Sequence, residues 1–156
     1  MKFKSLVFLL ILPLIFVTSC DEDPTRTELI LAHPWRVDNY NFQASAGGIT
    51  ISNALLEPYI DDIVAQAPLN GIITFDASTF SIDDQGTILE GTWSLSSDES
   101  ELTMIFTLGS QSFTFEIVKV TADEFNLKYT IEQSVEISDG NFVTVNLEIT
   151  AFLVPV

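Results

Sequence analysis

The segment FNLKYTIEQSVEISDGNFVTVNLEITAFL, residues 125–153, decides the fold. Apolar side chains occupy alternate positions on both sides of a turn sequence, Ser138-Asp139-Gly140-Asn141. Because successive side chains of a β-strand point to opposite faces, this alternation predicts two strands that each have one apolar face. The Asp-Gly pair is typical of a tight hairpin turn. The segment is therefore expected to form a long antiparallel hairpin with one face in a core.

The same alternation recurs from Trp35 onward, in six further segments with turn-like links between most of them. They span residues 35–42, 73–75, 80–82, 89–95, 102–108 and 113–117. Together with the two strands of the hairpin they make eight. Eight sequential strands suit an up-and-down barrel, because closure leaves no exposed sheet edge. We predict an all-β fold, an eight-stranded antiparallel up-and-down barrel with one short helix between strands 1 and 2.

The predicted helix lies between Gly48 and Pro68, where apolar residues recur at helical spacing. Pro58 suits only the first turn of a helix, so the regular helix should begin near it. We expect this helix to lie over one end of the barrel, with Gly47-Gly48 as a hinge. The residues expected to pack on the barrel are Leu56, Ile60, Ile63 and Val64.

A second short segment, TELILA at residues 27–32, precedes the first strand. It is long enough for one helical turn. Such a turn would close an end of the barrel with Ile30 and Leu31.

The N-terminus has the pattern of an export signal. Lys2 and Lys4 precede an apolar run from Leu6 to Val17, which is too short for the ~20 residues that span a bilayer. The run ends in Val-Thr-Ser-Cys, which resembles the lipobox of bacterial lipoproteins. That resemblance implies cleavage before Cys20 and acylation of its thiol and amino group; the alternative is a plain secretory signal with an accidental cysteine.

These observations divide the chain into three parts. Residues 1–19 are a predicted lipoprotein signal peptide, residues 20–27 the lipidated cysteine and an acidic tether, and residues 28–156 the barrel domain. Acidic residues directly after the cysteine resemble inner-membrane retention signals in some bacteria and surface-export signals in others. The strand-rich domain resembles lipoproteins of the second group, so we expect a lipid-anchored protein of the cell envelope, at the outer membrane.

The charge of the chain excludes some partners. It has 22 Asp and Glu against 6 Lys and Arg, for a net charge of −16. Nucleic-acid binding needs basic surface for phosphate contacts, so we expect none. An anionic membrane surface would also repel this domain, so attachment to a bilayer is expected through the acylated Cys20 alone.

Residues for catalysis or metal binding are sparse. His33 is the single histidine and Cys20 the single cysteine, and no phosphate loop or dinucleotide motif occurs. The pair Asp83-Asp84 lacks the alternating carboxylates of a calcium loop. We therefore expect no enzyme activity, no cofactor and no metal site.

Three short motifs resemble those of the bacterial lipocalin-like lipoproteins. They are His33-Pro34-Trp35-Arg36-Val37, Gly91-Thr92-Trp93-Ser94-Leu95 and Val120-Thr121-Ala122-Asp123-Glu124-Phe125. The first has His33 where a glycine would complete Gly-x-Trp, and the last strand has no arginine to stack on Trp35. The resemblance implies a lipocalin-like barrel whose long first loop covers the open end.

Aromatic side chains predicted to point inward give two hypotheses. They either fill the barrel, which is just wide enough for side chains, or line a cavity for one small hydrophobic ligand. The candidate ligand-binding residues are Trp35, Tyr40, Tyr59, Trp93, Phe106 and Tyr129. The leading function is non-catalytic binding of that ligand. The alternative is a protein-interaction module, an accessory subunit or inhibitor that meets an envelope protein through its outer surface and loops; a filled barrel with an exposed apolar patch would favour it.

Overall fold

The computed structural model describes residues 23–156, without the side chains of Asn53 and Ile137. The predicted signal peptide and Cys20 lie outside the described residues. The helices are α1 (Arg26–Leu31) and α2 (Glu57–Ala65), with a 3-10 turn η1 (Asn53–Leu55). The strands are β1 (Trp35–Ala46), β2 (Ile49–Ile51), β3 (Ile72–Phe75), β4 (Thr79–Asp84), β5 (Thr87–Leu95), β6 (Glu101–Phe106), β7 (Ser112–Val120), β8 (Phe125–Ser138) and β9 (Asn141–Pro155).

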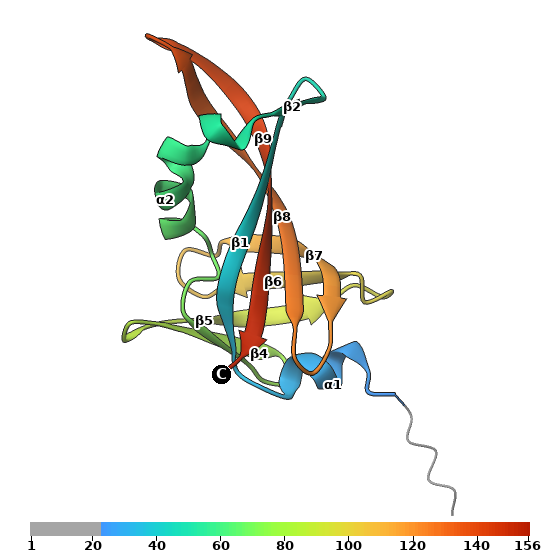
Figure 1. Cartoon of the computed structure of the whole chain (residues 1–156). Coiled ribbons are helices and arrows are strands. Elements are labelled where there is room, and N and C mark those ends of the chain that lie inside the picture. Colours follow the sequence, from blue (N-terminus) through green and yellow to red (C-terminus); the bar gives the residue numbers. More distant parts are fainter. Residues whose placement is uncertain (1–22) are drawn as a thin grey trace, which may run out of the picture.

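Eight of these strands form a closed antiparallel barrel (Figure 1). From β3 to β9 each strand pairs with the next in sequence, and β1 closes the barrel between β9 and β3. The pairing of β1 with β9 is long, from Trp35 opposite Pro155 to Ser45 opposite Asn146. The pairing of β1 with β3 involves only Trp35 and Arg36. This topology confirms the predicted up-and-down barrel.

The first predicted loop contains a strand that the prediction missed. Strand β1 continues past Phe42 to Ala46 and turns back into β2, which pairs with the end of β1. Gly47 and Gly48 have φ angles of +56° and +80°, the left-handed conformation that a two-residue hairpin turn requires and that glycine adopts without strain. The two glycines therefore form a hairpin turn where the sequence suggested a hinge.

The end of β6 also differs from the prediction. The apolar alternation suggested that Leu108 continues the inner face of this strand. The strand ends at Phe106, and Leu108 lies in the turn to β7 with 81% of its surface exposed.

Helix α1 closes one end of the barrel. Thr25 caps it in a reciprocal capping box, since its hydroxyl accepts a hydrogen bond from the Glu28 N–H while the Glu28 carboxylate accepts one from the Thr25 N–H. Ile30 is fully buried, and its carbonyl oxygen accepts a 2.9 Å hydrogen bond from Trp35 Nε1. The predicted closure is therefore confirmed for Ile30, whereas Leu31 is 37% exposed and belongs to the rim.

The barrel above α1 is filled with aromatic rings. Trp35 packs edge-on against Phe125 at 5.5 Å, Phe125 packs on Phe75, and Phe75 packs on Trp93 at 5.3 Å. The aromatic residues of the strands that were expected to point inward belong to the core or pack against it: Trp35, Phe75, Phe80, Trp93, Phe106, Phe113, Phe115, Phe125 and Tyr129. Fully buried aliphatic residues such as Leu102 complete this part of the core.

Helix α2 lies toward the other end of the molecule, beside the parts of β1, β8 and β9 that extend beyond the barrel (Figure 1). Pro58 stands in its first turn, as predicted. Of the expected packing face, Leu56 and Ile63 are buried, and Ile60 and Val64 are half-buried. Among residues 23–156, no helix is both long and apolar enough to cross a membrane.

Candidate ligand pocket at the barrel mouth

The floor of the pocket is formed by apolar side chains from three neighbouring strands. Leu89 of β5, Phe106 of β6 and Phe113 of β7 face the barrel interior near its open end. The ring of Phe106 packs edge-on between Phe80, at 5.0 Å, and Phe113, at 5.7 Å. These contacts fix the orientation of the rings, which present an apolar surface to the pocket.

The space for the Phe80 ring is provided by Gly91. Phe80 lies opposite Gly91 on β5, which in turn lies opposite Phe106 on β6. A methyl group on Gly91 would come within 2.6 Å of Phe80 Cε1 and still closer to the carbonyl oxygen of Ile105. Only glycine allows the two rings to meet across β5, which gives the Gly-Thr-Trp motif a structural role.

The roof of the pocket is the loop that joins α2 to β3. Ala67 and Pro68 line the pocket, and Leu69 is fully buried and anchors the loop. Asn70 Nδ2 donates a 2.7 Å hydrogen bond to the carbonyl of Val64 at the end of α2. The Tyr40 hydroxyl donates to Asn70 Oδ1 at 3.3 Å and so ties the loop to β1.

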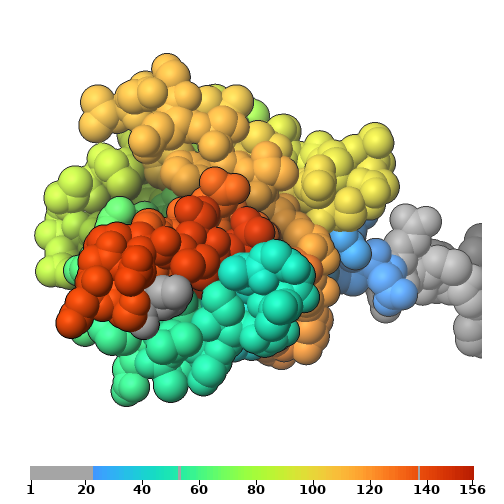
Figure 2. Space-filling view, turned by 90° about the horizontal axis from the view of Figure 1, so that it is seen from above, coloured from blue at the N-terminus to red at the C-terminus, as the bar shows by residue number. Residues whose placement is uncertain are grey.

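The pocket between floor and roof has a volume of about 290 Å³. It opens between the turn that joins β4 to β5 and the turn that joins β6 to β7, both at the periphery in the view from above (Figure 2). Apolar groups form most of its wall, with polar side chains around them. The polar lining residues are Gln66, Asn70, Asp84, Glu90 and Gln111. A pocket of this kind suits an apolar group that carries one polar end.

A second hollow adjoins the first and is more open to solvent. It has a volume of about 740 Å³ and shares Ala65, Asn70 and Asp84 with the mouth pocket. Asp83 and the turn Gln85-Gly86 form its outer wall. This hollow is therefore a polar vestibule beside the apolar pocket.

The six predicted ligand-binding residues lie in different parts of the molecule. Phe106 lines the mouth pocket, and the other five are not among its lining residues. Trp35 and Trp93 belong to the filled part of the core, where Trp93 Nε1 donates a 2.7 Å hydrogen bond to the Asp76 carbonyl. Their indole groups therefore stabilise the core and do not line the mouth pocket.

The three tyrosines take other positions. Tyr59 of α2 accepts a 3.1 Å hydrogen bond from the Glu136 N–H and ties α2 to the far part of β8. Burial raises the pKa of Tyr40 to about 12, and burial together with the neighbouring Tyr40 raises the pKa of Tyr129. Both phenols are thus neutral over the physiological range, and Tyr129 packs on Phe115 at 5.4 Å.

The roof of the pocket could not be predicted from the sequence pattern. Ala67, Pro68 and Leu69 follow α2 in a loop without a strand or helix pattern. The one signal was an isolated leucine between Pro68 and Asn70, since a lone apolar residue in a polar loop often anchors that loop.

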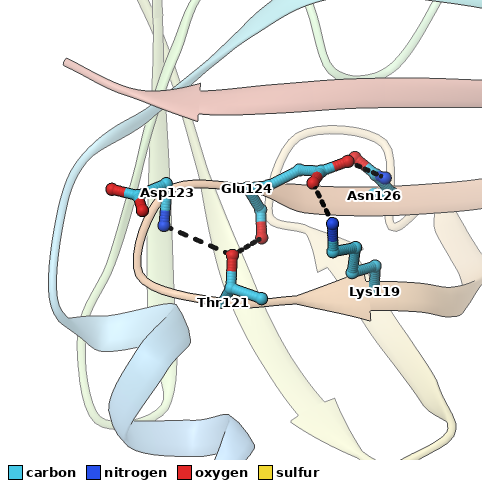
Figure 3. Close-up of polar contacts among 5 residues, drawn as sticks. All are labelled: Lys119, Thr121, Asp123, Glu124 and Asn126. Carbon is cyan, nitrogen blue, oxygen red and sulfur yellow. Dashed lines mark hydrogen bonds and ion pairs between the residues drawn. The ribbon is translucent and has the colours of Figure 1, made fainter.

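Of the acidic pairs in the sequence, Asp61-Asp62 lies on α2, Asp83-Asp84 ends β4, and Asp98-Glu99 and Asp123-Glu124 lie in turns. In the turn between β7 and β8, the Glu124 carboxylate accepts hydrogen bonds from Lys119 and from Asn126 Nδ2 (Figure 3), and the Lys119 bond is the main cause that lowers its pKa. Thr121 Oγ1 accepts from the Asp123 N–H at 3.3 Å in the same turn. These bonds give the Thr-Ala-Asp-Glu motif a structural role as a turn.

The described residues bring together no group of three His, Cys, Asp or Glu side chains that could hold a metal ion. His33 lies at the closed end of the barrel, where its ring meets Trp35 edge-on at 6.1 Å.

Comparison with known proteins shows a structural likeness. No protein-family model matches the sequence, and no curated protein matches it. Among solved structures, the chain is similar to a lipocalin-like protein from Bacteroides uniformis ATCC 8492, whose crystal structure was determined at 1.79 Å resolution. The two are 15% identical with a TM-score of 0.44, over 81% of this chain and 99% of that chain. The barrel itself follows from the strand pairing of this chain.

Proposed function

We propose that this chain is a membrane-anchored, non-catalytic lipoprotein with a lipocalin-like barrel, which binds one small apolar ligand in the mouth pocket. The observation that carries the proposal is the pocket of about 290 Å³ between the Leu89, Phe106 and Phe113 floor and the Ala67-Pro68 roof. Binding of an apolar ligand there is favourable, because burial removes the apolar surface of the ligand and of these side chains from water.

The size of the pocket limits the ligand. A water molecule takes about 30 Å³ of liquid, so a cavity of 290 Å³ holds roughly ten groups of that size. Below the pocket the barrel is filled, since Phe115 and Met104 are fully buried. The ligand therefore lies at the mouth and does not extend down the barrel axis.

A series of straight-chain alcohols tests this proposal by calorimetry. Each added methylene group contributes about 0.8 kcal/mol when buried, which is about fourfold in affinity. We expect one site whose affinity rises with chain length and levels off near ten carbon atoms. A series with no saturable binding at any length would refute the proposal.

A pair of variants tests whether the ligand binds beneath the Ala67-Pro68 roof. Ala67→Trp puts an indole group into the roof and should weaken decanol binding at least tenfold. Ala122→Trp, in the exposed turn between β7 and β8, is the matched control and should bind decanol as the parent does.

The anchor is a separate part of the proposal. Its support is the Val-Thr-Ser-Cys sequence after a short apolar run, which favours acylation of Cys20 and attachment at the outer membrane. Two or more acyl chains give stable anchoring without other apolar surface. We expect Cys20→Ser to move the protein to the soluble fraction; a variant that fractionates with membranes like the parent would contradict the anchor.

A second candidate function is recognition of an envelope protein. It is favoured by the hairpin of β8 and β9, whose far end projects beyond the barrel (Figure 1) and carries Phe142 with 63% of its surface exposed. Native mass spectrometry of protein from its host distinguishes the two functions: a small-molecule adduct supports the first, and a stoichiometric protein partner that Phe142→Ser releases supports the second.

A further inference from the structure

We infer that the mouth pocket selects amphiphiles with a cationic head group, such as a long-chain amine, and discriminates against fatty-acid anions. The inference rests on the proposed function, because it concerns the ligand of the same pocket. It follows from the charges that surround the apolar floor and from the positions of the basic residues.

The ionisable residues that line the mouth pocket are both acidic. Asp84 stands at the end of β4, on the same strand face as the buried Ile82. Glu90 lies on β5 next to the inward-facing Leu89, so its exposed side chain points to the outer face of the barrel. The adjoining vestibule shares Asp84 and adds Asp83, whose Oδ1 accepts a 2.8 Å hydrogen bond from the Gly86 N–H. A head group that leaves the apolar pocket on this side therefore meets carboxylates.

The basic residues of the described part of the chain lie elsewhere, and none lines either hollow. Arg26 donates to the Glu99 carbonyl, and Lys119 pairs with Glu124. Lys128 lies 2.7 Å from Glu116. A carboxylate ligand would thus find no cation within the pocket lining.

The geometry also explains how one ligand satisfies both surfaces. The apolar floor and the vestibule meet at Asn70 and Asp84, which line both hollows. An alkyl chain of about ten carbon atoms fills the inner pocket. Its head then emerges beside Asp84, where an ammonium group is attracted and a carboxylate is repelled.

Three ligands with the same chain test the inference: decylamine, 1-decanol and decanoate, each measured by calorimetry below its micelle concentration. At 20 mM salt we expect decylamine to bind at least tenfold more tightly than decanoate, with decanol between them. The Debye length falls from about 10 Å at 0.1 M salt to about 3 Å at 1 M, so the ratio should shrink several-fold in high salt.

Charge-removing variants separate the pocket from the overall charge of the protein. The variant D84N should reduce the amine-to-carboxylate ratio at least fivefold. The control D123N removes the same number of charges from a residue that does not line either hollow and should keep the parental ratio.

The outcomes of these measurements distinguish failure of the inference from failure of the proposed function. Decanoate binding as tight as decylamine overturns the inference, while decanol binding keeps the proposed function. Equal effects of D84N and D123N also overturn it, because the preference would then come from net charge. If none of the three ligands binds, the proposed function fails first.

Discussion

Replacing Gly91 by alanine should be among the most damaging single-methyl changes in this protein. The residue is buried at the centre of the sheet, with the Phe80 ring against its α-carbon. An added Cβ would lie 2.6 and 2.7 Å from two atoms of that ring, and real Cβ atoms essentially never approach so closely. Its backbone φ is not left-handed, so the penalty is steric.

The magnitude follows from the two neighbours. The Phe80 ring can rotate only by pushing on Phe106, which it already touches at 5.0 Å. The other neighbour is the backbone carbonyl of Ile105, which can move only if the pairing of β5 with β6 shifts. Overpacking typically costs 1–3 kcal/mol, and with a backbone clash we expect about 3 kcal/mol for Gly91→Ala.

Urea unfolding followed by tryptophan fluorescence measures this loss, because Trp35 and Trp93 are both buried. The midpoint should fall while the slope with denaturant stays constant. Thr92→Ala, at the exposed neighbouring position, is the control. Adding Phe80→Leu to Gly91→Ala should restore part of the stability and leave the carbonyl clash. A loss below about 1 kcal/mol for Gly91→Ala would refute the reasoning.

Two further predictions concern the closed end of the barrel and its acid stability. Trp35→Ala and Trp93→Ala should each cost about 3–5 kcal/mol of unfolding free energy in the same urea assay, whereas Phe142→Ala should stay within about 0.5 kcal/mol; a tryptophan variant in that lower range would contradict its place in the core. The Ser96 and Ser100 hydroxyls donate to the Asp98 carboxylate and lower its pKa to about 2. Because the folded pKa lies below the unfolded value of about 3.9, this stabilisation is complete above pH ~4 and is lost as the pH falls through 2. A carboxyl titration of Asp98 by NMR with a midpoint near 4 would contradict it.

The β-strands could be read from the sequence because their cause is local. The alternation of residues 125–153 predicted the inner face of β8 and β9, and Leu127, Leu147, Ile149 and Leu153 are fully or nearly fully buried. The apolar side chains must leave water, and with a period of two they can do so only on one face of a strand. The position of Pro58 fixed the start of α2 in the same local way.

The local pattern did not distinguish strand residues from turn residues at the ends of strands. Leu108 continues the alternation of β6 but lies in a turn, because Phe106 already completes the strand's pairing with Gly91. The segment at residues 49–51 was not recognised as a strand, since three residues are too few to show a period. Its pairing comes from the turn at Gly47-Gly48 and from the length of β1.

The sequence by itself determined most of the strands and the barrel, because these follow from periodicity. The tertiary structure decided that aromatic rings fill the closed part of the barrel. Only the tertiary structure decided where a ligand could enter. Six aromatic residues were candidates, and the fold uses Trp35 and Trp93 to seal the closed end and places Phe106 at the open mouth. The pocket depends on the distance between the loop at Ala67-Pro68 and strands β5 to β7, which are separated in sequence. No local pattern encodes that distance, because it is set by the packing of Leu69 and by the hydrogen bonds of Asn70.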